Sequence, residues 1–261
     1  MASFNKRQLT ENGFCLLQGI QKDWISECRN IIDEVIGFDT TKHCAYSRED
    51  WHKLVRTAQD YINLNGALDK FIAMVGEDVK NALNATNLGF VNVLKLRAVR
   101  PLNRTAIADH VPFHRETFYA KDSHVRMQFN LWTPISVVDG DLAGLMLYPE
   151  SHKISDTELS ISQCPSHESA VRRFSDGHAI GYPYSPKIIQ NLAEITSCPP
   201  LRVVVPYQST LLFSSMLIHG NGVNRSNATR FSVDTGAIDL AFVKCNDPLF
   251  AAGNKGHYRA V

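Results

Sequence analysis

The chain has 261 residues, 44% of them hydrophobic, with 27 basic and 26 acidic side chains. This length suits one large β-rich domain or two small ones. The near balance of charges argues against a nucleic-acid-binding protein, which would need a large or clustered basic excess. The N-terminus lacks the apolar core of a signal peptide, and no run is long enough to span a bilayer. Six cysteines without a CxxC pair fit a reducing setting, so we expect a cytoplasmic protein that binds no membrane.

The first ninety residues are predicted to be mainly helical around one strand. Apolar residues recur at helical spacing in 24–36 and in 67–83. The short apolar run 13–21 contains a glycine at each end of its apolar core and is typical of a strand.

From about residue 91 the hydrophobic period changes from near 3.6 to 2, which indicates β-structure. Strands are expected at 91–99, 125–132, 144–149, 201–206, 210–215 and 230–238. Short strands separated by turns predict an antiparallel barrel or jelly roll. We expect a single domain over 1–261, with barrel strands in 91–152 and 200–245. The irregular segment 153–199 between them is expected to be an insertion that serves as a lid.

Two potential metal ligands, His114 and Glu116, lie two residues apart. On an extended strand such residues face the same way and can reach one ion. A second histidine, His219, ends an apolar, strand-like run. Two histidines and one carboxylate form the facial triad of non-haem Fe(II) oxygenases, which leaves positions open for cosubstrate and O₂. We therefore predict that these three residues bind the metal and form the catalytic centre, and that the nearby His110 does not.

A possible carboxylate-binding pair follows the second histidine. Arg230 and Ser232 share one face of a predicted strand, and a guanidinium can bind a carboxylate through two parallel hydrogen bonds. This pair suits the distal carboxylate of 2-oxoglutarate, and we prefer Arg230 to Arg225, which lies in a loop rich in glycine and asparagine. Gln128 and Asn130 lie opposite an apolar strand face, so they either point into the barrel and contact 2-oxoglutarate or face solvent.

The order of these features resembles the phytanoyl-CoA dioxygenase-like branch of the Fe(II)/2-oxoglutarate oxygenases. The resemblance covers about residues 90 to 240 and is carried by FHRETFY at 113–119, MQFNLWTPI at 127–135, LMLYPESHK at 145–153 and HGNGVNRSNATRFS at 219–232. It implies a mainly β fold with flanking α-helices, the double-stranded β-helix (jelly roll, cupin-like). It also implies Fe(II), 2-oxoglutarate and O₂ as cofactors, with Arg230 binding 2-oxoglutarate.

One residue departs from the pattern of that family, because Glu116 stands where most members have aspartate. A glutamate can still bind iron, whereas halogenating relatives have a small residue there that leaves a position for halide. The resemblance therefore implies a dioxygenase that hydroxylates or desaturates a small-molecule metabolite or biosynthetic intermediate. The alternatives are a cupin-like metal-dependent isomerase or epimerase without 2-oxoglutarate, against which Arg230 and Ser232 argue, and a non-catalytic binding module. The sequence indicates neither the substrate nor the oligomeric state.

Overall fold

A computed structural model describes residues 2–102, 109, 113–116, 126–136, 144–155, 158–159, 192, 194–196, 198–242 and 258–261. Its α-helices are α1 (Ala2–Asn12), α2 (Lys22–Val35), α3 (Thr40–Ala45), α4 (Arg48–Leu64) and α5 (Ala67–Leu83). The short 3-10 helices η4 (Ser151–Lys153) and η5 (Leu240–Phe242) follow later in the chain. Among the described residues, no helix combines the length and the apolar character needed to cross a bilayer.

The long helices form because each has one apolar face and a defined start. In α2 the buried residues are Trp24, Ile25, Cys28 and Ile32, and in α4 they are Trp51, Val55, Ala58 and Ile62. Both sets follow the three-to-four-residue spacing of one helix face. The Ser47 hydroxyl accepts a hydrogen bond from the Asp50 amide at 3.1 Å and so caps the first turn of α4.

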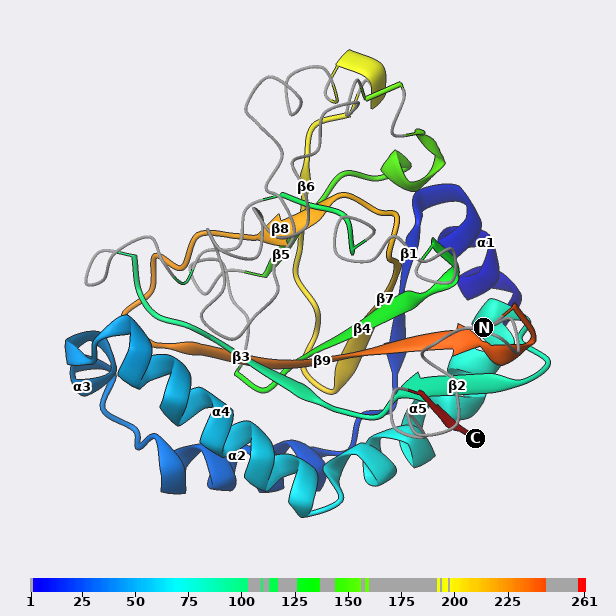
Figure 1. The fold of residues 1–261 in the computed structure, drawn as a ribbon. Coiled ribbons are helices and arrows are strands. Elements are labelled where there is room, and N and C mark those ends of the chain that lie inside the picture. Colours follow the sequence, from blue (N-terminus) through cyan, green and yellow to red (C-terminus); the bar gives the residue numbers. More distant parts are fainter. Residues whose placement is uncertain are drawn as a thin grey trace.

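The strands form two antiparallel sheets (Figure 1). The large sheet has the order β1 (Phe14–Gln18), β7 (Ser209–Ser214), β4 (Phe129–Pro134), β9 (Arg230–Asp239), β2 (Leu88–Val91) and β10 (Tyr258–Ala260), and β3 (Lys95–Val99) also pairs with β9. The small sheet has the order β6 (Leu201–Val203), β5 (Leu145–Leu147) and β8 (His219–Asn221). Mainly antiparallel sheets with several helices confirm the predicted fold class.

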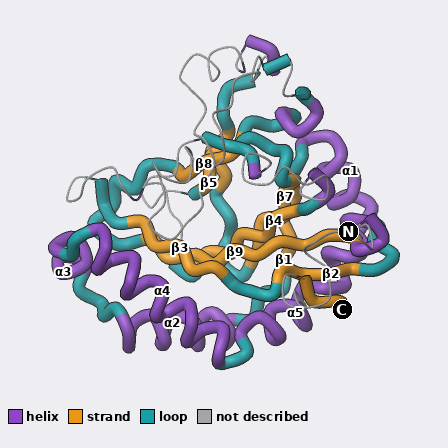
Figure 2. The backbone as a smooth tube through the Cα atoms, viewed as in Figure 1, coloured by secondary structure: helices purple, strands orange, loops and turns teal. Residues whose placement is uncertain are grey.

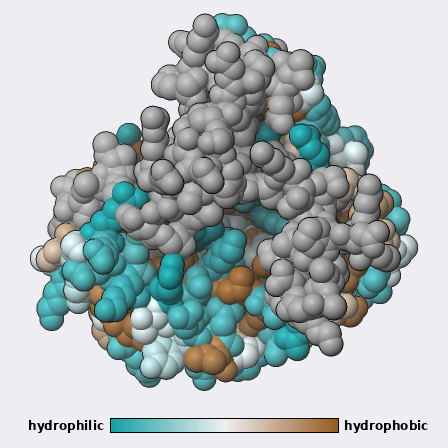
Figure 3. Space-filling view, viewed as in Figure 1, coloured by the Kyte–Doolittle hydropathy of each residue, from teal (hydrophilic) through white to brown (hydrophobic). Residues whose placement is uncertain are grey.

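The large sheet lies between the helices α2, α4 and α5 and the small sheet (Figure 2). On its helix side, Leu131 and Phe231 belong to one apolar core with residues of α2, α4 and α5. On its other side, Trp132 and Phe213 pack with Leu147 of the small sheet. Alternate residues of each central strand therefore face two different layers, as the two-residue period predicts. On the face drawn in Figure 3, hydrophobic side chains of the described residues are scattered among hydrophilic ones.

Several predicted boundaries differ from the observed ones. The strand expected at 91–99 is two strands, β2 and β3, separated by three residues. The strand expected at 125–132 begins at Phe129, and the one expected at 201–206 ends at Val203. Most of the expected lid, including 160–191, lies outside the described residues, so the lid and the single-domain layout stay predictions.

Candidate metal centre

The three predicted metal ligands lie on two adjacent segments at the edge of the small sheet. His114 and His219 form an isolated antiparallel bridge, with backbone N–H to carbonyl distances of 2.8 and 3.0 Å. The Glu116 amide donates to the Ser215 carbonyl at 3.0 Å. This pairing brings residues that are far apart in the sequence to one place.

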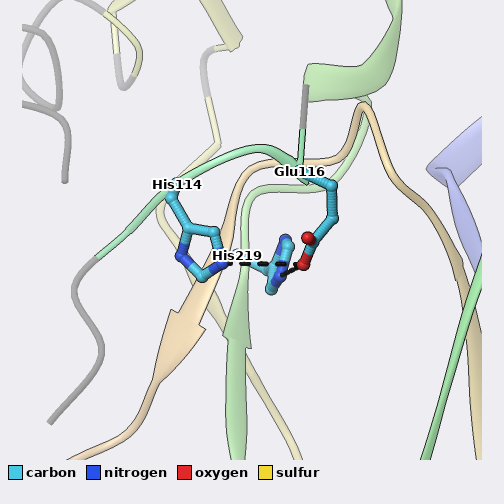
Figure 4. Close-up of side chains that lie close together, drawn as sticks. All are labelled: His114, Glu116 and His219. Carbon is cyan, nitrogen blue, oxygen red and sulfur yellow. Dashed lines mark ion pairs between the residues drawn. The ribbon is translucent and has the colours of Figure 1, made fainter. Parts of the chain in front are cut away.

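The side chains of His114, Glu116 and His219 point toward a common centre (Figure 4). One carboxylate oxygen of Glu116 lies 3.7 Å from His114 Nε2 and 3.4 Å from His219 Nε2. The three potential ligand atoms all lie within 4.8 Å of one another. Two ligand atoms at about 2.1 Å from one ion and at a right angle are about 3 Å apart. The donor set and its spacing therefore fit one metal ion of the kind that a facial triad binds.

The protein fixes the ionic state and the orientation of these ligands. Burial alone raises the pKa of the Glu116 carboxyl, but the adjacent imidazoles of His114 and His219 hold that pKa well below its ordinary value. His219 Nδ1 lies 2.9 Å from the Leu217 carbonyl, which can only accept, so this nitrogen donates. In the neutral ring that binds a metal, Nε2 then carries the lone pair and faces the centre.

Arg230 and Ser232 are both buried, and Arg230 contacts the strand that carries His219. The Arg230 guanidinium is fully buried, 3.3 Å from the Asn221 side-chain oxygen and 5.5 Å from the centre of the Trp132 ring. Burial lowers the pKa of Arg230 to about 10, so the side chain stays cationic at neutral pH. The buried Ser232 hydroxyl has no hydrogen-bond partner among the described residues. A cation beside an unsatisfied hydroxyl fits an anionic ligand, whereas Arg225 is exposed.

Gln128 and Asn130 face the same side of β4 as Trp132, which packs against the small sheet. A side chain at Gly236 would lie 2.6 Å from the Gln128 amide nitrogen, so Gln128 packs directly against β9. The sequence left inward and solvent-facing orientations open; in the structure Asn130 is buried and Gln128 is partly buried, and their contact with 2-oxoglutarate stays a prediction. Asn130 pairs across the strands with Phe213, whose ring lies 4.8 Å from the His219 ring.

The polarity of the Gln128 amide is set by a residue that sequence reasoning missed. The Tyr258 hydroxyl donates to Gln128 Oε1 at 2.8 Å, and Gln128 Nε2 donates to Asn130 Oδ1 at 3.1 Å. This chain of hydrogen bonds leaves the Asn130 NH₂ group as a donor on the side of β4 that faces the small sheet. No local pattern could have revealed the contact of Tyr258 with Gln128, because 130 positions in the sequence separate the two residues.

A hollow of about 480 Å³ lies between α2, α3 and the start of β9, and the triad residues do not line it. Its charged lining is already bound within the protein. Arg29 pairs with Asp33 at 2.9 Å, and both His43 nitrogens lie within 3.1 Å of an oxygen. These contacts stabilise the helical layer and offer little to a ligand.

The chain belongs to the phytanoyl-CoA dioxygenase (PhyH) family, whose model matches residues 9–232. No curated protein matches the chain.

Solved structures share its fold at low sequence identity. SnoK, a non-heme alpha ketoglutarate dependent carbocyclase from nogalamycin biosynthesis, superposes with a TM-score of 0.60 at 13% identity, covering 92% of this chain and 85% of SnoK. The corresponding epimerase, SnoN, gives a TM-score of 0.56 at 10% identity, with 92% and 83% covered. AviO1 from Streptomyces viridochromogenes Tue57 gives 0.57 at 14% identity, with 92% and 96% covered. SnoN has also been solved with Fe3+, alpha ketoglutarate and nogalamycin RO.

Proposed function

We propose that this protein is an Fe(II)- and 2-oxoglutarate-dependent dioxygenase that hydroxylates or desaturates a small-molecule metabolite or biosynthetic intermediate. One observation carries the proposal. His219, a member of the His114–Glu116–His219 cluster, begins β8, and Asn221 ends it. The buried Arg230 contacts the Asn221 side chain, so the cluster and this cation lie at opposite ends of β8. A dicarboxylic 2-oxo acid needs this combination, a metal for its 2-oxo acid end and a cation for its far carboxylate.

Each residue of the site has a distinct task in this proposal. His114, Glu116 and His219 hold the ion, and the anionic Glu116 offsets part of its charge. Arg230 and Ser232 bind the far carboxylate of 2-oxoglutarate, and the Asn130 NH₂ group is placed to bind an oxygen near the metal. When bound, Fe(II) with 2-oxoglutarate and O₂ supplies the oxidising power that removes hydrogen from a substrate C–H bond.

A second candidate outcome keeps the same cofactors but ends in epimerisation or ring closure. The solved structures that share the fold include a 2-oxoglutarate-dependent epimerase and a carbocyclase, which supports this alternative. An isomerase that uses no 2-oxoglutarate is disfavoured, because it gives no task to the buried cation of Arg230 beside the Ser232 hydroxyl.

Anaerobic Fe(II) titration and succinate release test the proposal. We expect one Fe(II) per chain and formation of succinate when O₂ is admitted with 2-oxoglutarate. His114→Ala and His219→Ala should each abolish Fe(II) binding, because each removes one of three protein ligands. His110→Ala is the control and should bind Fe(II) normally. Binding of Fe(II) without any conversion of 2-oxoglutarate to succinate would contradict the proposal and favour the isomerase.

A further inference from the structure

The residue between the two adjacent ligands, Arg115, faces away from the metal centre and is fully buried. A buried guanidinium is costly unless its donors are satisfied. Arg115 Nη2 donates to the backbone carbonyl of Ser151 and, at 2.7 Å, to that of Ile154. The His114–Glu116 segment is therefore attached through Arg115 to the turn formed by residues 151–154.

The same turn is also attached to the segment that carries the third ligand. The fully buried Ser151 hydroxyl accepts a hydrogen bond at 2.8 Å from the amide of Ile218, the residue before His219. The Tyr148 amide donates to the Ile218 carbonyl at 2.9 Å. Ser151 thus contacts both ligand-bearing segments, one through its carbonyl and one through its hydroxyl.

The turn is held from its outer side by the end of α1. The Glu150 amide donates to the Asn12 carbonyl at 3.0 Å, and His152 Nε2 lies 3.1 Å from the Thr10 carbonyl. Gly13 packs so closely that a side chain there would lie 2.5 Å from His152 Nδ1. The turn therefore has little freedom to move away from the two segments that it joins.

Among the described residues, which include 113–116 but neither flank of that stretch, the direct backbone pairing of these segments is short. His114 and His219 form an isolated bridge, and Glu116 adds one backbone hydrogen bond to Ser215. With so few backbone hydrogen bonds, the segment that carries His114 and Glu116 can rotate or shift relative to the segment that carries His219 unless other contacts fix it.

We propose that Arg115 and Ser151 are positioning residues that set the spacing between the His114–Glu116 pair and His219, and through it the affinity for the metal. We call the contacts of Arg115 and Ser151 with the two ligand-bearing segments the clamp. The identity of the ion rests on the proposed function, whereas the clamp requires only that the triad binds a divalent cation. Loss of groups that orient metal ligands typically weakens metal binding or activity by about 10–100-fold.

Ser151→Ala and a matched serine variant test this role. Ser136 is the match, because its hydroxyl is also buried and accepts from a backbone amide, that of Phe231, at 2.9 Å. Phe231 is next to Arg230, whereas Ile218 is next to His219, so only Ser151 supports a residue beside a metal ligand.

The measurement is an anaerobic Co(II) titration followed by visible absorption, with thermal unfolding of the metal-free proteins. We expect Ser151→Ala to bind Co(II) about 10–100-fold more weakly and to change the absorption bands of the bound ion. Ser136→Ala should lose comparable stability but keep the Co(II) affinity and spectrum of the unmodified protein. A purely structural role for Ser151 would change stability in both variants and affinity in neither.

Arg115→Lys and Arg115→Met extend the test. Lysine keeps the charge but cannot reproduce the planar fork, so it should recover part of the affinity that methionine loses. If Arg115→Met does not fold, Ser151→Ala decides. A folded Ser151→Ala protein with unchanged Co(II) affinity overturns the clamp. If the unmodified protein binds Co(II) and Ser151→Ala weakens it, but iron-loaded protein releases no succinate, the clamp stands and the proposed function fails.

Discussion

Glu116 reaches the metal centre with a side chain one methylene longer than aspartate. Its carboxylate lies 3.4 and 3.7 Å from the two imidazole nitrogens. We expect Glu116→Ala to abolish turnover and Glu116→Asp to retain part of it, because aspartate restores a carboxylate withdrawn by about one C–C bond, roughly 1.5 Å. Succinate release and Fe(II) titration measure both effects. An aspartate variant as inactive as the alanine variant would mean that the strand lies too far from the metal for the shorter side chain.

Arg230 offers the sharpest test of the cosubstrate. Truncating one partner of a buried, hydrogen-bonded charge pair costs about 2–5 kcal/mol, because the other charge is left unpaired. We expect Arg230→Ala to raise the KM for 2-oxoglutarate about thirty-fold or more, with Fe(II) affinity nearly unchanged. Arg230→Lys should recover part of the loss.

Arg225→Ala is the control, since that side chain is exposed in the loop before β9. A large KM effect in Arg225→Ala but not in Arg230→Ala would show that the carboxylate binds elsewhere. Unchanged KM values in both would remove 2-oxoglutarate as the cosubstrate.

At the scale of single residues, local alternation was enough to place several side chains. It predicted that His114 and Glu116 share a face and that Arg230 lies on a strand, as the structure shows. It could not predict that Tyr258 bonds to Gln128, or that Arg115 bonds to the turn at Ser151. Those contacts join segments that are distant in sequence, so they depend on how whole elements pack.

At the scale of elements, the break between β2 and β3 shows why a period of two predicts strands better than their ends. The Asn63 side chain of α4 accepts from the Leu94 amide at 2.9 Å and donates to the Leu94 carbonyl at 2.8 Å. Gln59 of the same helix accepts from the Leu96 amide at 3.1 Å. A helix thus takes backbone hydrogen bonds that a continuous ladder would use. This competition comes from distant side chains and leaves no trace in the local pattern.

The contact of α1 with the turn at 151–154 predicts an unequal effect of two glycine substitutions. Gly13 and Gly19 both have positive φ, +86° and +106°, so alanine is strained at either position. A side chain at Gly13 would also lie 2.5 Å from His152 and 2.7 Å from Leu217, whereas nothing lies within 4 Å at Gly19.

We expect Gly13→Ala to lower the free energy of unfolding by about 1–3 kcal/mol more than Gly19→Ala, the typical cost of overpacking a close contact. Urea unfolding of the two variants measures the difference. Equal losses would mean that α1 moves away from the turn at no cost.

At the scale of the whole molecule, the two hydrophobic periods predicted a helical layer and a β-layer, and the structure contains both. The sequence did not indicate that β1 joins the large sheet beside β7, because pairing between such distant strands has no local signal. The sequence also did not indicate which residue joins the helical layer to the start of β9 by a hydrogen bond. His43 of α3 does so, with Nδ1 2.9 Å from the Thr229 hydroxyl.

The buried contact of His43 with Thr229 predicts that the free energy of unfolding decreases in acid. Burial lowers the pKa of His43 below 6.5, so the folded state favours the neutral ring. When pH falls below about 6.5, the unfolded chain takes up a proton that the folded protein resists, and the free energy of unfolding decreases. We expect unfolding at pH 7.5 and pH 5.5 to differ less in His43→Gln than in the unmodified protein. An identical pH dependence in both would show that His43 does not titrate on unfolding.

The order of strands in the large sheet has a consequence for the chain while it is being made. Phe14 pairs with Phe213, and β9, the strand with most partners, spans residues 230–239. At about 5–20 residues per second, a ribosome needs roughly 10 to 40 seconds between those two phenylalanines. During that interval the apolar strand FCLLQ lacks β7, the strand with which it pairs, and is exposed to aggregation or to chaperones. His219 emerges later still, so a nascent chain holds only two of the three ligands, and iron can be loaded only once nearly all of this sequence has been translated.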